Sequence, residues 1–241
     1  MPRDSSLPSN AFNTTRWSIV LAARHDDARG RKALETLCGH YWYPLYAYVR
    51  RQNVGADEAA ELTQAFFARF LEKNYLRDVR RERGRFRAFL LSSLKHFMAN
   101  ERDYCNALKR GGGRAIVSID ACDAEGRYRL EPSEGVTPER LFERRWALLL
   151  LERVLARLRA EFDEAGKGVL FETLKERLSG KGELYKEAAE KLGLSEAGVK
   201  TAVHRLRKRY REILREEIAQ TVATAEDVED EIGYLFEVLR A

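Results

Sequence analysis

Residues 187–209 read EAAEKLGLSEAGVKTAVHRLRKR, and this stretch decides which fold the chain is expected to have. It passes through Gly193, a residue that can adopt the left-handed backbone of a tight turn. Ser195 follows as a strong N-cap for a second helix. The spacing of Ala189, Gly193 and Val199 suits a helix-turn-helix, because a small residue lets the helices approach, the glycine makes the turn and the branched residue packs them together.

The second helix of this pair is predicted to display a polar, basic face opposite its apolar stripe. That face is rich in hydrogen-bond donors and fits a DNA major groove, with base edges met near its start and phosphates further along. The predicted DNA-binding residues here are Ser195, Lys200, Thr201, His204, Arg205, Lys208 and Arg211. A solvated basic helix without a ligand would carry the same charges, but it would leave the turn and the cap unexplained.

Composition extends the helical prediction to the whole chain. Of 241 residues, 44% are hydrophobic and only five are proline, and strand-type runs of Val, Ile and Thr are scarce. The formal net charge is only +5, but basic residues cluster at 77–87 and 200–215, and acidic residues at 226–231. No segment is apolar over the length of a membrane span, and the N-terminus lacks a signal-peptide core. Because the three cysteines are scattered and form no CxxC motif, we expect a cytoplasmic protein that does not insert into membranes.

Three helical stretches are predicted in the N-terminal half. The first, from about 17 to 52, is expected to break at Gly30. The second spans about 57–72, with an apolar stripe on one side and acidic residues in its first turn. The third spans about 86–107 and follows an arginine-rich loop. Its exposed face is predicted to carry Arg87, Lys95 and Arg102.

Residues 111–137 contain several glycines, a proline and mixed charges, and are predicted to form a flexible linker. A helical pattern resumes after Thr137, which is a suitable N-cap, and Pro138 occupies the first helical position. We therefore expect an all-α chain of two helical domains joined by this linker, the C-terminal one containing the helix-turn-helix. The predicted parts are a disordered leader at 1–15, an N-terminal domain at 16–110, the linker at 111–137, a C-terminal domain at 138–218 and an acidic helix at 219–241.

The acidic C-terminal helix allows two interpretations. Its apolar stripe is predicted to consist of Val228, Ile232, Leu235, Phe236 and Leu239. Amphipathic helices mostly serve packing, which favours a helix that covers its own domain. The alternative is an autoinhibitory or regulator-binding helix, whose carboxylates compete with DNA for the basic face.

The chain resembles a known family in both halves. Residues 187–195 and 199–209 resemble the first helix, the turn and the recognition helix of bacterial RNA polymerase sigma factors, most closely those of the extracytoplasmic-function (ECF) type. DEAAELTQAFF at 57–67 resembles the acidic helix with which this family docks on the polymerase. FRAFL at 86–90, leading into LKHF at 94–97, resembles the helix that opens and reads promoter DNA. The resemblance covers about 31–107 and 141–215.

The resemblance implies a subunit that confers promoter recognition on the polymerase and starts transcription. The implied partners are the clamp of the core enzyme and promoter DNA, and an anti-sigma or other regulatory protein is a further partner that the resemblance allows. It places polymerase binding at Asp57, Glu58, Glu61 and Gln64. It places minus-ten element binding at Arg85, Arg87, Lys95, His96, Asn100 and Arg102, and minus-thirty-five binding on the second helix of the helix-turn-helix.

The chain also departs from the family pattern. Lys95-His96 stand where Arg-Asn is usual, Asn100 stands where an acid is usual, and Ala65 stands where Glu is usual. These departures leave the promoter sequence and its regulation open.

No catalytic set is apparent, so we expect neither an enzyme nor a bound cofactor or metal. The four histidines have no metal-ligand spacing, and the glycine run at 111–113 lacks the Lys-Ser/Thr of a phosphate loop. Two rival interpretations remain open. One is a stand-alone helix-turn-helix regulator that binds a duplex operator without polymerase. The other is a helical protein-interaction adaptor whose basic helix faces an acidic protein.

Overall fold

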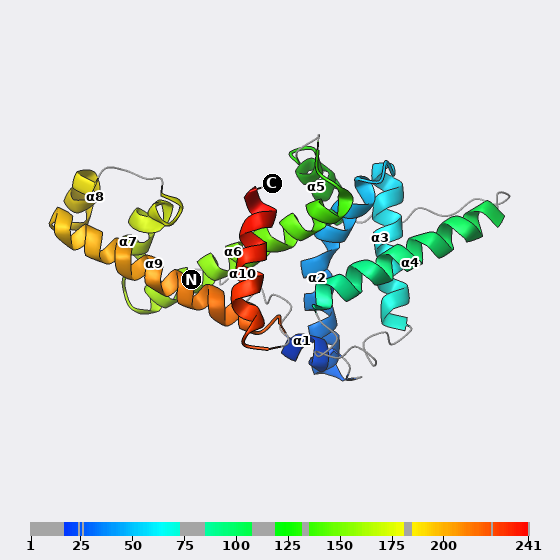
Figure 1. The fold of residues 1–241 in the computed structure, drawn as a ribbon, viewed down its shortest axis with the longest axis horizontal. Coiled ribbons are helices and arrows are strands. Elements are labelled where there is room, and N and C mark those ends of the chain that lie inside the picture. The colour runs from blue at the N-terminus through cyan, green and yellow to red at the C-terminus, as the bar shows by residue number, and fades with distance from the viewer. Residues whose placement is uncertain are drawn as a thin grey trace, which may run out of the picture. The chain divides into compact units, whose positions relative to one another are not determined.

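The computed structural model describes residues 17–23, 25, 27–72, 85–107, 119–131, 135–180, 185–222 and 224–240. All regular secondary structure in these ranges is helical, which confirms the predicted all-α class (Figure 1). The chain divides into two compact units, Met1–Arg80 with Phe86–Phe142 and Arg81–Arg85 with Glu143–Ala241. The division between Phe142 and Glu143 lies inside a helix and not in the predicted linker at 111–137.

The first unit places the predicted N-terminal helices close to their expected bounds. It contains α1 (Trp17–Ala22), α2 (Ala28–Arg50), α3 (Ala56–Glu72), α4 (Phe86–Ala107), α5 (Ile119–Tyr128) and the start of α6 (Pro138–Glu164). The helices predicted at 57–72 and 86–107 are confirmed. The predicted leader at 1–15 lies outside the described residues.

The expected break at Gly30 is wrong, because this glycine lies in the first turn of α2. The interruption precedes it, and Asp27 caps α2 by accepting a hydrogen bond from the Gly30 amide at 2.7 Å. A glycine is needed there for space, since a Cβ atom at this position would lie 1.7 Å from the carbonyl oxygen of His25. The sequence therefore marks a close backbone approach at Gly30 and not a helix end.

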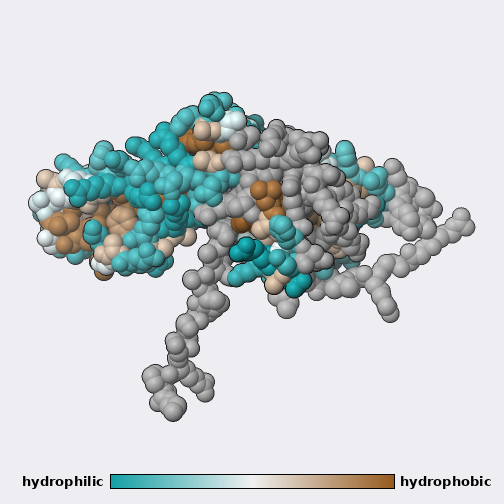
Figure 2. Space-filling view, turned by 90° about the horizontal axis from the view of Figure 1, so that it is seen from below, coloured by the Kyte–Doolittle hydropathy of each residue, from teal (hydrophilic) through white to brown (hydrophobic). Residues whose placement is uncertain are grey.

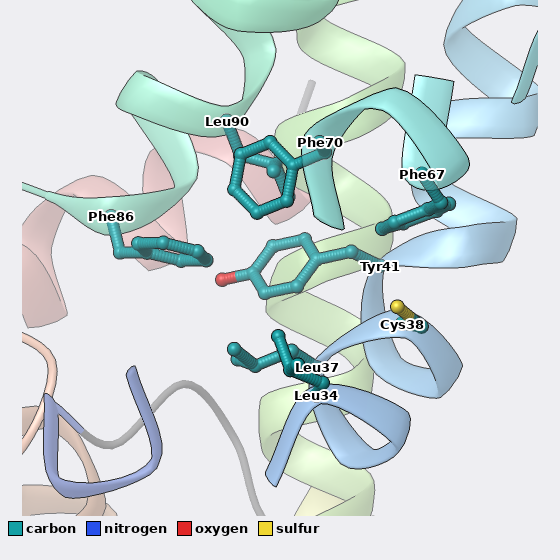
Figure 3. Close-up of a pocket in the computed structure, with 8 residues that line it drawn as sticks. All are labelled: Leu34, Leu37, Cys38, Tyr41, Phe67, Phe70, Phe86 and Leu90. Carbon is teal, nitrogen blue, oxygen red and sulfur yellow. The ribbon is translucent and has the colours of Figure 1, made fainter. Parts of the chain in front are cut away.

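Aromatic rings form the core of the first unit. Tyr41 of α2 is buried, and its ring centroid lies 5.8 Å from that of Phe86 (Figure 3). Phe97 of α4 is also buried, with its centroid 5.7 Å from that of Phe66 of α3, so this ring packs in the core. A small gap among these side chains is lined by Leu34, Leu37, Cys38, Tyr41, Phe67, Phe70, Phe86 and Leu90. Burial raises the pKa of the Cys38 thiol to about 11, so the gap offers no thiolate at neutral pH.

Helix α5 lies in the range predicted as a flexible linker and docks on α2. Glu125 accepts hydrogen bonds from the Tyr46 hydroxyl at 2.6 Å and from the Arg50 guanidinium at 2.9 and 3.0 Å. The Arg50 guanidinium also lies 4.7 Å from the centre of the Tyr128 ring. This part of the linker prediction is wrong because charges and tyrosines on α2, distant in sequence, supply partners for α5.

Glu125→Gln is expected to weaken this docking by about 2 kcal/mol, because it removes the charge from a bidentate hydrogen-bonded pair. The hydrogen bonds from Arg50 lower the pKa of Glu125 from 4.5 to about 2. The contribution is therefore fully present above pH 4.5 and is lost as pH falls from 4.5 towards 2. Denaturant unfolding of the wild type and the variant across this pH range measures it.

The matched control for this prediction is Glu35→Gln, which removes an exposed carboxylate from α2. Its unfolding free energy should stay close to that of the wild type at every pH. A wild-type advantage over Glu125→Gln that stays constant between pH 7 and pH 2 would contradict the assigned role of the ionised carboxylate.

The second unit consists of the rest of α6, then α7 (Gly168–Leu174), a 3-10 helix (Lys175–Ser179), α8 (Tyr185–Leu192), α9 (Glu196–Ala219) and α10 (Asp227–Arg240). Helix α7 is a short α-helix that tightens into the 3-10 helix before Gly180, whose φ is 80°. Within the described ranges, no helix combines the length and apolar character needed to cross a membrane.

Ion pairs join α6 to α9 within the second unit. Arg209 of α9 donates to Glu161 of α6 at 2.7 and 2.8 Å. Arg157 of α6 pairs with Glu216 and Glu217 of α9. Glu217 is 0% exposed and also lies 3.7 Å from Arg153, which is 7% exposed. This network fixes which side of α9 faces α6.

Helix α10 packs against α9, with Glu229 accepting from Arg215 at 2.8 Å. Its buried stripe differs from the predicted one. Val228, Glu231, Leu235 and Val238 are buried. Phe236 is 47% exposed, because it lies one residue, about 100° of helix rotation, beyond Leu235. The contacts show that α10 packs on α9 of its own unit, as the first interpretation of the tail expects.

Candidate nucleic-acid interface

A short turn joins α8 to α9, and its chemistry follows the sequence. Gly193 has a φ of 63°, and Leu194 donates to the Ala189 carbonyl at 3.0 Å, which closes the end of α8. Ser195 caps α9, and its hydroxyl oxygen accepts from the Gly198 amide at 3.1 Å. The predicted glycine turn and serine cap are therefore confirmed. Leu194, between the glycine and the cap, is 42% exposed.

Gly193→Ala is expected to destabilise the second unit by about 1 kcal/mol, because alanine is disfavoured in the left-handed region. Nothing lies within 4 Å of a Cβ atom built on Gly193, so the effect comes from the backbone alone. Denaturant unfolding measures it. The control is Gly233→Ala in α10, a position with equally open space and no positive φ, which should be neutral or stabilising. Equal effects of the two substitutions would contradict the prediction.

Helix α9 has a buried face and an exposed polar face over its first four turns. Val199, Val203 and Leu206 are buried on the inner side. The exposed residues of the outer side are Lys200, Thr201, His204, Arg205, Lys208 and Arg211. Among the residues that the structure describes, none forms an ion pair with the five of these that bear a basic group. The predicted DNA-binding residues of this helix therefore share one surface whose basic groups are not neutralised, and Ser195 lies exposed at its start.

Two other arginines of the same basic cluster do not belong to that surface. Arg207 donates to the carbonyl oxygen of Arg177 at 2.6 and 3.2 Å, and so holds the end of the 3-10 helix. Arg209 forms the ion pair with Glu161 that is described above. The sequence alone gives no sign of this difference, because the partners lie about thirty and fifty residues upstream along the chain.

Tyr185, at the start of α8, contacts two cations of the second unit. Its ring centre lies 4.2 Å from the Arg177 guanidinium and 5.6 Å from the Lys200 ammonium. The structure thus brings Arg177 and Tyr185 next to a predicted DNA-binding lysine. Their positions could not be read from spacing, since residues 181–184 separate the 3-10 helix from α8.

Hydrophobic residues also reach the surface of the second unit. Val169 and Leu194 are exposed, and Figure 2 shows brown surface among teal at the end of this unit formed by α7 and α8. The surface of the second unit thus includes apolar area as well as the polar face of α9.

The residues predicted for the minus-ten element have different environments in the structure. Arg87 is 2% exposed, so its predicted exposure is wrong; it lies on the side of α4 that faces the core. Lys95 is exposed but pairs with Glu139 at 2.7 Å, and this pair lowers the pKa of Glu139. His96 and Asn100 are exposed on α4. The side chain of Arg102 lies outside the described residues.

Arg85, the remaining residue of this group, belongs to the second unit. Its guanidinium lies 2.5 Å from Glu231 of α10 and 4.9 Å from the centre of the Tyr234 ring. The predicted minus-ten residues therefore do not form one free basic surface.

The predicted polymerase-binding residues lie on the outer side of α3. Asp57, Glu58, Glu61 and Gln64 are all exposed. Within the described part of the chain, no Lys, Arg or His forms an ion pair with these three acids. Thr63, next to Gln64, faces inwards and donates to the Ala59 carbonyl at 2.7 Å. The helix thus presents an acidic side that is not neutralised within the described residues.

In comparisons with known proteins, no family model, no curated protein and no solved structure matches this chain. Among the described residues, no group of three or more His, Cys, Asp or Glu side chains is arranged to hold a metal ion. The surfaces described above and the sequence resemblance are therefore the features that indicate a function.

Proposed function

We propose that the chain is a sigma factor of the ECF type, a cytoplasmic subunit that gives bacterial RNA polymerase its promoter recognition. The observation that carries the proposal is the polar face of α9, whose cations have no carboxylate partner within the described residues, although acids neutralise other arginines of the same helix. A cationic face kept free on a capped helix that follows a tight turn suits a ligand with regularly spaced negative charges.

Duplex DNA is the ligand that this face fits. Thr201 and His204 lie near the start of α9, where side chains would reach base edges in the major groove. The Thr201 hydroxyl donates to the Ala197 carbonyl at 3.0 Å, so it offers its oxygen as an acceptor. Lys208 and Arg211 lie further along and would bind phosphates, which fix the register without reading sequence. The Ser195 hydroxyl uses an oxygen lone pair for its cap and keeps its proton to donate to a phosphate. We assign this face to the minus-thirty-five element.

The first unit would supply the other two functions of such a subunit. The carboxylates of Asp57, Glu58 and Glu61 would meet a basic surface of the polymerase clamp, where complementary charge gives specificity and a fast association rate. His96 and Asn100 of α4 are the exposed groups left to contact the minus-ten element, together with Lys95 when it leaves Glu139. Arg87 is no longer among the proposed DNA contacts, because it is buried.

Run-off transcription with purified core polymerase and genomic promoter fragments tests the proposal. The full chain should associate with core polymerase and direct initiation at defined start sites. Glu61→Lys should abolish both, because it reverses a charge on the docking side of α3. Glu35→Lys, which reverses an exposed charge on α2, is the control and should leave both intact.

The rival functions give different results in the same experiment. A stand-alone regulator would bind one duplex sequence tightly without polymerase, and Glu61→Lys would not affect it. An adaptor would bind an acidic protein, and DNA would not compete with that protein. A chain that neither associates with core polymerase nor directs initiation refutes the proposal.

A further inference from the structure

A carboxylate occupies the middle of the packed stripe of α10. Glu231 is 0% exposed, and its neighbours on the stripe are Val228, Leu235 and Val238. A buried ionised carboxylate is unfavourable unless a cation and hydrogen bonds compensate for its lost hydration. An apolar residue would serve packing better, so the acid points to a role in holding a cation.

Arg85 is a cation that the carboxylate holds. The closest atoms of the two side chains lie 2.5 Å apart, and the arginine side chain is 38% exposed. Tyr234, one helical turn after Glu231, places its ring centre 4.9 Å from the same guanidinium. Both α10 groups thus bind Arg85, and we call them the Glu231–Tyr234 pair.

Arg85 directly precedes α4 in the chain and is one of the residues expected to bind the minus-ten element. The guanidinium fork that binds a carboxylate is the same group that would bind a phosphate. While Glu231 holds it, the arginine is therefore not available to nucleic acid.

The acids of α10 leave the proposed duplex-reading face untouched. Glu229 pairs with Arg215, and Glu231 pairs with Arg85. The cations between Lys200 and Arg211 on the exposed side of α9 take no part. Any effect of α10 on DNA binding is thus directed at Arg85 and not at the face of α9.

We propose that α10 is an autoinhibitory helix, and that its Glu231–Tyr234 pair withholds Arg85 from nucleic acid until α10 releases it. This inference rests on the proposed function only for the identity of the ligand, which is the sugar-phosphate backbone of promoter DNA. It refines the earlier alternative for the tail, because the residue that α10 competes for is Arg85 and not the basic face of α9.

The test is a titration of the full-length chain with a fluorescein-labelled single-stranded oligonucleotide, followed by fluorescence anisotropy at several salt concentrations. Glu231→Gln keeps the shape of the side chain and should raise the affinity about three- to tenfold, since one guanidinium becomes available for a phosphate. The slope of log affinity against log salt should steepen by about 0.7, which corresponds to one more contact with a single strand.

Three further variants separate release of Arg85 from other effects. Glu237→Gln removes the same charge from the exposed side of α10 and should change the affinity by less than about twofold, because a solvated charge is screened. Arg85→Ala added to Glu231→Gln should cancel the gain, whereas Arg85→Ala alone should leave the wild-type affinity nearly unchanged. Tyr234→Leu keeps an apolar side chain and should raise the affinity by a smaller factor than Glu231→Gln.

Thermal unfolding of each variant shows whether α10 remains folded; if Glu231→Gln unfolds, Tyr234→Leu carries the test. Affinities of Glu231→Gln and Tyr234→Leu equal to the wild type would overturn the inference. So would an Arg85→Ala variant that loses affinity in the wild-type background, because Arg85 would then already be free, and so would the absence of oligonucleotide binding in every variant. The proposed function fails separately, if run-off transcription and polymerase binding are absent while the Arg85-dependent gain is present.

Discussion

The double variant Lys200→Ala, Arg205→Ala is expected to lose at least about tenfold of promoter-specific transcription, since a hydrogen bond to a charged group such as a phosphate contributes about 1.5–3 kcal/mol. Both side chains are exposed on α9, and neither pairs with a carboxylate in the described residues. Their removal therefore takes away ligand contacts and, within the unit, the contact between the Lys200 ammonium and the Tyr185 ring. The salt dependence of promoter binding by the reconstituted enzyme should become shallower, with a slope reduced by about 2 for two lost phosphate contacts.

The matched control removes two cations of the same unit from elsewhere. Lys167 and Arg240 are exposed and lie outside α9, and Lys167→Ala, Arg240→Ala changes the net charge by the same amount. Run-off transcription and filter binding at several salt concentrations compare the two double variants. Equal activity of both would remove the face of α9 from the proposed mechanism, and equal losses in both would show that only net charge matters.

The turn between α8 and α9 was predictable because its causes are local. A positive φ demands Gly193, and the amides at the start of α9 demand a cap such as Ser195. The bounds of α3 and α4 were predictable for a similar reason, since their apolar residues repeat with the helical period.

Whether a charged side chain is exposed, buried or paired was not predictable, because this depends on partners that the fold brings close. Arg87, Arg207 and Arg209 look like other basic residues of their segments. In the structure, Arg87 is buried in the core, Arg207 donates to a backbone carbonyl and Arg209 pairs with Glu161. The helical period predicts which face of a helix is buried. It does not predict which polar side chains can be buried on that face because another part of the chain pairs with them. The structure therefore removes or pairs more of the residues predicted to bind the minus-ten element than of the residues predicted to bind DNA on α9.

The same limit explains why α5 and Glu231 were missed. Residues 119–128 contain a glycine and mixed charges, which is typical of a linker, but Tyr46 and Arg50 give Glu125 its partners. The stripe predicted for α10 omitted Glu231 because acids are rarely buried, and this buried acid pairs with Arg85, far away in the sequence. In both cases an ion pair across a long sequence separation decides the structure.

Glu217→Ala should be the most destabilising single substitution in the α6–α9 network, at about 3 kcal/mol, because it removes a buried charge that compensates other buried charges. The Glu217 carboxylate is 0% exposed and lies 3.2 Å from Arg157 and 3.7 Å from Arg153. Glu212→Ala is the control on the same helix, since this acid is 44% exposed and pairs only at the surface with Arg209, which makes a loss under about 1 kcal/mol the expected result. Denaturant unfolding compares the two variants.

The stability of α9 and its use in DNA binding should separate in these experiments. Glu217→Ala should lower transcription only as far as the second unit unfolds at the assay temperature, and the folded fraction should keep the wild-type salt dependence. Lys200→Ala, Arg205→Ala should do the reverse, with a loss of unfolding free energy no larger than about 1 kcal/mol and a shallower salt dependence. If Glu217→Ala altered the salt slope without unfolding the unit, the network would belong to the binding surface and not to its support. The buried side of α9 would then no longer be separable from the exposed side, and the assignment of DNA contacts to the exposed side alone would fail.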